Sequence, residues 1–156
     1  MPNLFPDGYE EEVLTEADLL DDKPIGYKDS IYFDEELQDL VRDGQYRIKS
    51  ANGLEAWEQW CINCIQTERD VYPCYGEFFG IKTLEAFSTD DREKTESILT
   101  REICEGLQND PYGRTEYVSE VVFDWYAPDA VNITAVVHGI DDVTIDITAT
   151  IDRRAR

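Results

Sequence analysis

The sequence predicts an α+β fold in which two main helices pack on a small, mostly antiparallel sheet, preceded by an extended acidic N-terminal arm. Three patterns lead to this class. Apolar residues recur at helical spacing in residues 53–70 and again in 89–109. They alternate with threonine and aspartate from Val143 to Ile151, as in a half-buried antiparallel strand. Residues 7–22 contain eight acids, no base and too few aliphatic side chains to form a core.

The first helix, residues 53–70, has the clearest start and end. Its apolar stripe carries Leu54, Trp57, Cys61, Cys64 and Ile65. Asn52 suits the N-cap position, and Glu55 stands where the acid of a capping box belongs. Pro73 prevents the helix from continuing far past Asp70.

Glu68 lies on the apolar stripe of this helix, next to Arg69. A buried carboxylate without a partner costs several kcal/mol. We therefore expect a cationic or hydrogen-bonding partner, the candidate cations being Arg69, Arg101 or a cation of a neighbouring subunit. Glu102, beside Arg101, has a similar position on the second helix.

The second helix, residues 89–109, begins where Ser88 to Asp91 fits a capping pattern. Its apolar stripe carries Ile98, Leu99, Ile103, Gly106 and Leu107. Asn109, Pro111 and Gly113 end it. Just before this helix, we expect residues 74–87 to form a short buried strand or a loop.

Strand patterns occupy most of the remaining chain. Short strands are expected at Ser30–Phe33 and Tyr46–Lys49, with a helical turn or a hairpin between them. Three longer strands are expected at Glu116–Tyr126, Val131–His138 and Val143–Ile151. The predicted core comprises Leu54, Trp57, Cys61, Ile65, Ile98, Leu99, Ile103, Leu107, Val121, Phe123, Trp125, Ile145 and Ile147.

The length of 156 residues predicts one folded domain, residues 31–151, with the acidic arm 1–30 before it and a basic tail 152–156 after it. The arm either lies along its own domain or a neighbour, or is a disordered solubilising tail. The net charge of −21 argues against free nucleic acid as a partner and favours basic protein surfaces. We expect neither a membrane span nor a signal peptide, because no apolar run is long enough.

The chain has four cysteines, at Cys61, Cys64, Cys74 and Cys104. The first two invite a zinc or redox interpretation, but no second CxxC exists, and His138, the single histidine, lies in a strand pattern. Buried thiols that fill helix faces are the favoured interpretation, with metal or redox chemistry as the alternative. We expect all four to be reduced and unliganded, and no cofactor.

The segment GLEAWEQWCINCIQTERD, followed by YGEFFGI, resembles a family of contractile-tail baseplate proteins. These are the wedge proteins of defective-prophage (PBSX-type) tails and of phage-tail-like bacteriocins, related to the lysozyme-like wedge protein of T-even phages. The resemblance runs from Arg47 to Ile151 and departs from the family pattern at Asp70 and at the displaced Arg114. It rests on residues 53–56, Gln59, Thr67–Arg69, Tyr75-Gly76, Phe79-Gly80, Arg101–Ile103, Leu107 and Asp110.

The resemblance implies a compact α+β domain placed in about six copies around the tail tube. Its partners would be other baseplate wedge proteins, tail sheath subunits whose polymerisation it nucleates, and hub or tube proteins. Donated strands would join neighbouring sheets. The protein would assemble in the host bacterial cytoplasm and end in the baseplate of the virion, without contacting nucleic acid or membrane. The implied partner-binding residues are Thr67, Glu68, Arg69, Arg101 and Glu102.

The alternative is a cell-wall glycoside hydrolase, because the T-even relative is named for a lysozyme activity. Glu68 and Glu102 would be its two carboxylates, one of them kept protonated in an apolar site. However, Arg69 and Arg101 adjoin these acids, and a guanidinium favours the ionised carboxylate, the wrong state for a general acid. We therefore expect a structural protein rather than an enzyme, with a different acidic adaptor as a further possibility.

Overall fold

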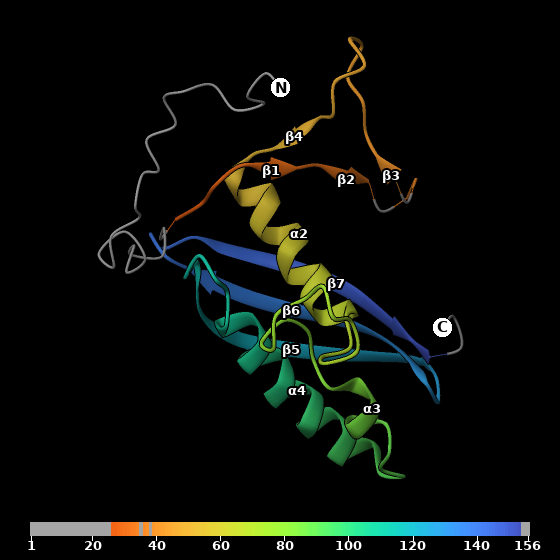
Figure 1. The fold of residues 1–156 in the computed structure, drawn as a ribbon. Helices are drawn as coiled ribbons and strands as arrows, with labels where there is room; N and C mark the ends of the chain where they lie inside the picture. Colours follow the sequence, from red (N-terminus) through yellow and green to blue (C-terminus); the bar gives the residue numbers. More distant parts are fainter. Residues whose placement is uncertain (1–25, 35, 38, 154–156) are drawn as a thin grey trace, which may run out of the picture.

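The computed structural model describes residues 26–34, 36–37 and 39–153. They form a three-stranded antiparallel sheet whose one face is covered by two helices, with a projecting ribbon of short strands near the start of the first helix (Figure 1). The predicted α+β class is confirmed. Most of the predicted acidic arm, and the end of the basic tail, lie outside the described residues.

The sheet contains β5 (Thr115–Ala127), β6 (Ala130–Gly139) and β7 (Thr144–Asp152), in the order β5-β6-β7. The three long strands were predicted within two residues at each end. Ile133 of β6 pairs with Phe123 of β5 and Ala149 of β7, and this row faces the helices. The alternate residues face away from the helices, as the period-two pattern requires.

Helix α2 (Gly53–Gln66) begins with the predicted capping box, in which the Asn52 side chain accepts from the backbone N–H of Leu54 and Glu55. It ends four residues before the predicted Asp70, because Thr67 adopts an extended backbone and its carbonyl accepts from Ile81. Glu68 therefore lies outside the helix.

Leu54 was predicted in the core, and this is wrong: its side chain is 44% exposed. It does lie on the apolar stripe of α2. However, the first turn of the helix lies beside β1 (Ser30–Ile31) and β4 (Ser50–Ala51) rather than over the sheet (Figure 1). The apolar stripe of a helix is buried only along the part of the helix that packs on another element.

Helix α4 (Arg92–Gln108) starts later than predicted, with Asp91 as its N-cap. Ser88 does not cap it. The Ser88 hydroxyl instead donates to the Glu85 carbonyl at 2.6 Å and helps to end the short helix α3 (Thr83–Ala86). The predicted strand or loop at residues 74–87 is thus a loop followed by this helical turn.

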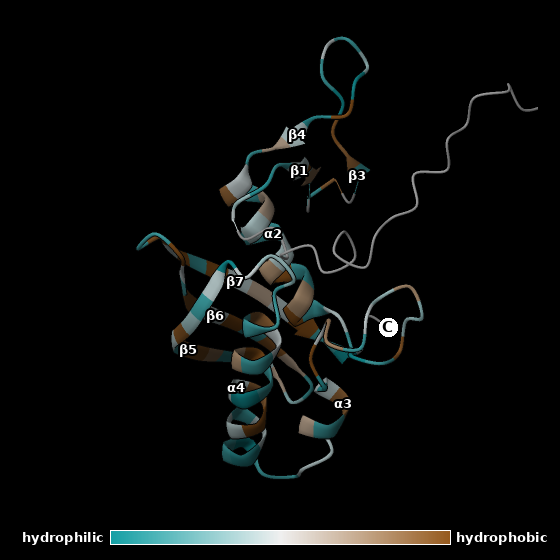
Figure 2. Ribbon diagram, turned by 60° about the vertical axis from the view of Figure 1, so that its left-hand side comes forward, coloured by the Kyte–Doolittle hydropathy of each residue, from teal (hydrophilic) through white to brown (hydrophobic). Residues whose placement is uncertain are grey.

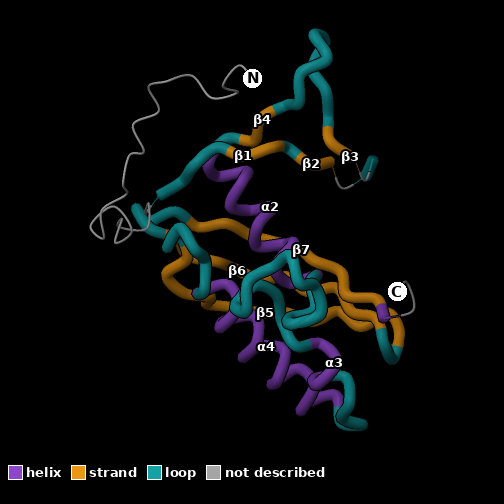
Figure 3. Tube along the Cα trace, in the orientation of Figure 1, coloured by secondary structure: helices purple, strands orange, loops and turns teal. Residues whose placement is uncertain are grey.

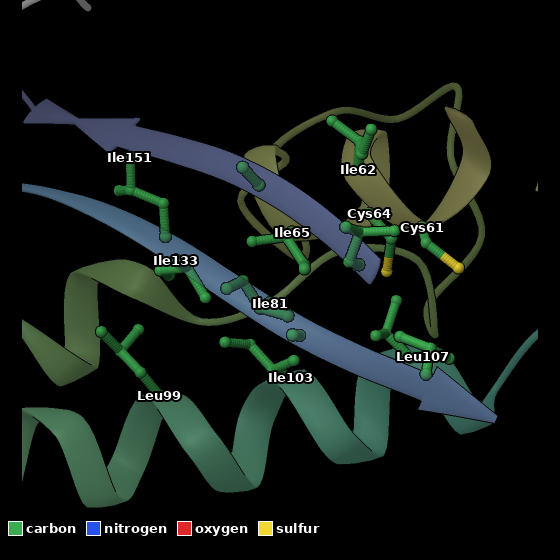
Figure 4. Close-up of a cluster of buried hydrophobic side chains, with 14 of the residues drawn as sticks. Cys61, Ile62, Cys64, Ile65, Ile81, Leu99, Ile103, Leu107, Ile133 and Ile151 are labelled. Atoms are coloured by element: carbon green, nitrogen blue, oxygen red, sulfur yellow. The ribbon is translucent and has the colours of Figure 1, made fainter. Parts of the chain in front are cut away.

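The core lies between the helices and the sheet, and Figure 2 colours much of the sheet as hydrophobic. Trp57, Cys61 and Ile65 of α2 and Leu99, Ile103 and Leu107 of α4 are fully buried there, as predicted. Figure 4 shows Ile81 among them, a loop residue that the prediction omitted. The predicted core residues Ile98, Val121, Phe123, Trp125 and Ile145 are only partly buried, at the margin of the cluster.

The predicted strand Ser30–Phe33 is split into β1 and β2 (Phe33–Asp34), which pair with β4 and β3 (Asp39–Leu40) respectively. The predicted strand Tyr46–Lys49 is wrong. Only an isolated bridge between Arg42 and Ile48 forms there, because Tyr46 takes a left-handed backbone with φ 60° in the turn.

Tyr27, which the prediction assigned to the arm, packs on the domain. Its ring lies 5.4 Å from that of Trp57, and its hydroxyl donates to the Ile140 carbonyl at 2.9 Å. Gly139 makes room for this contact, because a Cβ there would stand 2.5 Å from the Trp57 ring. Residues 26–30 therefore pack with the folded domain.

A buried ion pair secures the connection from α4 to β5. Arg114 meets Asp110 through two parallel hydrogen bonds of 2.7 and 2.9 Å, and their side chains are 3% and 0% exposed. The Arg114 backbone N–H also donates to this carboxylate at 2.9 Å. Two parallel bonds of this kind are the strongest geometry for an arginine and a carboxylate.

Removing one partner of this pair should destabilise the fold strongly. Arg114→Met leaves the Asp110 carboxylate buried without its cation, and we expect a loss of about 3–5 kcal/mol. The control is Lys94→Met, which breaks the 3.9 Å ion pair between the exposed Lys94 and Asp91 side chains and should cost under about 1 kcal/mol. Urea unfolding measures both, and equal losses would contradict the assigned role.

Candidate functional site

The candidate site is the connection from α2 to α3, residues 67–82, which runs as a loop across the end of α2 (Figure 3). The loop is closed by its own backbone. Ile81 donates to the Thr67 carbonyl at 2.9 Å, and Arg69 donates to the Ile81 carbonyl at 3.1 Å. The chain thus leaves α2, turns outward and returns beside its starting point.

Two glycines permit this closure. Gly80 has a φ of 95°, and a Cβ there would stand 2.6 Å from the Thr67 carbonyl oxygen. Gly106 of α4 lies against the same segment, where a Cβ would stand 3.2 Å from the Gly80 oxygen. A side chain at Gly80 would push the two ends of the loop apart, and a side chain at Gly106 would push α4 away from the loop.

Glu68 is buried at 5% exposure and accepts hydrogen bonds from the first turn of α3. Its donors are the Thr83 backbone N–H at 3.0 Å, the Thr83 hydroxyl, and the Leu84 backbone N–H at 3.2 Å. Free N–H groups at a helix start favour such a carboxylate. The expected hydrogen-bonding partner is confirmed, whereas the expectation that this carboxylate requires a cation is wrong, because uncharged donors of α3 satisfy it. Neither Arg69 nor Arg101 forms an ion pair with it in the described part of the chain.

Arg69 instead connects the loop to α4. Its side chain is 8% exposed; Nε donates to the Gly80 carbonyl at 3.0 Å, and the guanidinium lies 3.4 Å from Glu105 and 3.8 Å from Glu102. The buried Nη2 atom of Arg69 has no hydrogen-bond partner among the described residues. Glu102 also accepts from the Lys82 backbone N–H at 3.3 Å.

All five residues predicted for the site lie in or beside this cluster, but most face inward. Glu68 and Glu102 are buried, and Thr67 donates its hydroxyl to the Asn63 carbonyl at 2.6 Å. Only Arg101 exposes most of its side chain, 63%, while its guanidinium lies 3.3 Å from Glu102. The cluster therefore holds the loop in place, and Arg101 is the member whose side chain reaches the surface.

The outer side of the loop carries a row of aromatic rings that was not predicted as part of the site, although Tyr75 and Phe79 belong to the resemblance. Tyr72, Tyr75 and Phe78 are 46%, 49% and 65% exposed. Ring centroids are 6.1 Å apart for Tyr72 and Tyr75, 4.6 Å for Tyr75 and Phe79, and 5.8 Å for Phe79 and Trp60. The available signal was the density of aromatic residues in residues 72–79.

All of these rings except Tyr72 border a hollow of about 540 Å³, which we call the aromatic hollow. No charged side chain lines it, and neither Glu68 nor Glu102 opens into it. It is lined by Trp60, Asn63, Cys74, Tyr75, Gly76, Phe78, Phe79, Asn109 and Pro111. An exposed, uncharged aromatic surface is suited to binding another molecule rather than to acid–base chemistry.

The cysteines do not form a cluster. Cys61 and Cys64 are buried in the core, Cys104 is half-buried and Cys74 is exposed. Burial raises the pKa of the Cys61 thiol, and raises that of Cys64 to about 11. Within the described ranges, no three His, Cys, Asp or Glu side chains are grouped to hold a metal ion.

No helix among the described residues is long and apolar enough to cross a membrane. Comparison of the sequence with models of known protein families, and with curated proteins, finds no match.

A methyl group at Gly80 should disrupt the closure of the loop. Gly80→Ala combines an unfavourable φ with a clash against the Thr67 carbonyl, and we expect a loss of about 2 kcal/mol or more. Gly76→Ala is the matched control in the same loop, because nothing lies within 4 Å of its Cβ position. Thermal and urea unfolding would measure the difference; a neutral Gly80→Ala would contradict the close approach.

The buried thiols should make the fold sensitive to alkali. Thiols in the unfolded chain ionise near their ordinary pKa of 9.0, whereas burial holds the pKa of Cys64 at about 11 in the folded state. This contribution to stability is fully present below pH 9.0 and is lost as the pH rises toward 11. Urea midpoints across this range measure the loss, which should shrink in Cys64→Ala. A flat profile would contradict it.

Proposed function

We propose that this protein is a structural baseplate component of a contractile phage tail or phage-tail-like particle. In this role it joins wedge proteins around the tube and nucleates the polymerisation of the sheath. The identity of the particle comes from the sequence resemblance. The observation that carries the assembly role is the exposed aromatic row on a loop that is held in place by buried charges.

The aromatic hollow is the proposed contact with a neighbouring wedge protein. Tyrosine, tryptophan and phenylalanine bring large contact areas at low cost in side-chain entropy, and they dominate the energetic centres of protein interfaces. Phe78 exposes 65% of its surface to water in this chain. Covering such rings is favourable at about 25 cal/mol per Å² of apolar area removed from water.

The five predicted residues support this contact in two ways. Glu68, Arg69, Glu102 and Thr67 act as positioning residues, because their hydrogen bonds determine where the loop leaves and re-enters the fold. Arg101 is the member that a partner can reach, because its side chain is 63% exposed while its guanidinium pairs with Glu102. A loop positioned in advance loses less entropy on binding.

The sheet offers a second surface for assembly. β5 and β7 each pair only with β6, so that both outer strands have an edge without a strand partner among the described residues. Unpaired edges accept extended segments from other chains through backbone hydrogen bonds. This favours the contact with sheath subunits that the resemblance implies.

The hydrolase alternative receives less support. A glycosidase needs an acid whose proton reaches the substrate oxygen and a second carboxylate across the bond. The Glu68 carboxylate already accepts from three donors, and the Glu102 carboxylate lies against two arginines and a backbone N–H. Both groups serve the internal structure of the loop.

The proposal predicts a defect in assembly that is separate from folding. Tyr75→Ser with Phe78→Ser should leave circular dichroism and the urea midpoint nearly unchanged, because both side chains are about half exposed or more. Particles from a producing strain that carries this variant should lack complete baseplates by negative-stain microscopy. Leu54→Ser, which alters an exposed apolar side chain elsewhere, is the control.

Arg69→Ala tests the positioning role, with an expected loss of about 2–4 kcal/mol in stability and fewer complete particles. Glu68→Gln removes one acceptor and should act in the same direction.

Normal particles from the Tyr75 and Phe78 variant would reject the hollow as a docking surface. Peptidoglycan clearing that is present in the wild type and lost in Glu68→Gln would support the hydrolase instead.

A further inference from the structure

Residues 41–49, the ribbon tip, project away from the rest of the fold at the end of the short-stranded ribbon (Figures 1 and 2). Every residue from 42 to 49 is exposed. The tip carries three cations, Arg42, Arg47 and Lys49, in a chain whose net charge is −21. It is thus a basic projection on an acidic protein.

The one acid of the ribbon tip, Asp43, is used inside the turn. Its carboxylate accepts from the backbone N–H of Gln45 at 2.8 Å and of Arg47 at 2.9 Å. Tyr46 stands at the end of the turn with 83% of its surface exposed, and Ile48 is 44% exposed. The tip therefore carries cations together with an exposed aromatic and an exposed aliphatic side chain.

The face of the sheet that points away from the helices has the opposite character. β5, β6 and β7 contain no lysine or arginine. Their register aligns Glu120, Val136 and Asp146 in one row across this face, and Asp124, Asn132 and Thr150 in another. Val122, between the two rows, is 49% exposed. This open sheet face is acidic and partly apolar.

We propose that the ribbon tip of one copy docks on the open sheet face of a second copy. The ribbon adjoins the start of α2, on the side of the sheet that the helices cover (Figure 1). The open face lies on the other side, so the tip meets it most directly in a neighbouring molecule. This contact goes beyond the proposed baseplate role and does not depend on it.

Charge complementarity decides the choice of partner. Two copies of a chain with charge −21 repel each other at long range, but at physiological salt this repulsion is screened beyond about 8 Å. The local contact of arginines with carboxylates acts within that distance and survives. Because the two surfaces differ, a single contact of this kind is head-to-tail and produces a ring or an open chain of copies, whereas two reciprocal contacts close a two-fold dimer.

The test is analytical ultracentrifugation of the full chain at physiological ionic strength over a range of concentrations. The wild type should self-associate. Arg42→Glu with Arg47→Glu (the tip variant), and Asp124→Lys with Asp146→Lys (the face variant), should each lower the association constant at least about tenfold. Mixing the two variants restores opposite charges at every contact, so the mixture should associate although neither variant does alone.

The control is Lys28→Glu with Lys94→Glu, which changes the net charge by as much as the tip variant does. Both positions are exposed and lie away from the tip. This control variant should associate like the wild type. A wild type that is monomeric throughout, an unaffected tip variant, or a mixture that stays monomeric would each overturn the proposal. Binding of a short labelled DNA duplex by a monomeric wild type, lost in the tip variant, would assign the tip to nucleic acid instead.

Discussion

The buried Arg69 side chain is the interaction on which the arrangement of the helices depends. Its hydrogen bond to the Gly80 carbonyl fixes the end of the loop where the chain returns to α2. Its ion pairs with Glu102 and Glu105 connect the loop to α4. Glu68, the preceding residue, holds the start of α3. Two adjacent residues thus join α2, α3 and α4, and in doing so they orient the aromatic hollow toward solvent.

Buried charges of this kind contribute specificity more than net stability. Desolvation of a guanidinium and a carboxylate offsets most of their attraction, so apolar side chains would stabilise the same interface as well or better. What the charges supply here is directed contact: the guanidinium of Arg69 meets the Gly80 carbonyl, Glu102 and Glu105, which lie on two different segments of the fold. Such directed contacts are in keeping with the proposed role in assembly.

The acidic composition is distributed unevenly by the fold. Arg114 and Arg69 are buried against carboxylates, which removes two of the chain's cations from the surface. Glu120, Asp124 and Asp146 remain exposed on the open sheet face. The ribbon tip collects cations at the opposite side. A chain that appears uniformly acidic in composition therefore presents surfaces of both signs, which favours docking in defined orientations.

The sequence by itself determined the elements whose causes are local: the capping box from Asn52 to Glu55, the apolar stripe of α4, and the alternation along β7. The tertiary structure decided where those elements stop and what their polar residues bind. α2 ends at Gln66 because the Thr67 carbonyl accepts a hydrogen bond from Ile81. Glu68 accepts a hydrogen bond from Thr83. Both contacts join residues about fifteen positions apart in the sequence. Periodicity and capping act over neighbouring residues, whereas these hydrogen bonds exist only after the loop has closed.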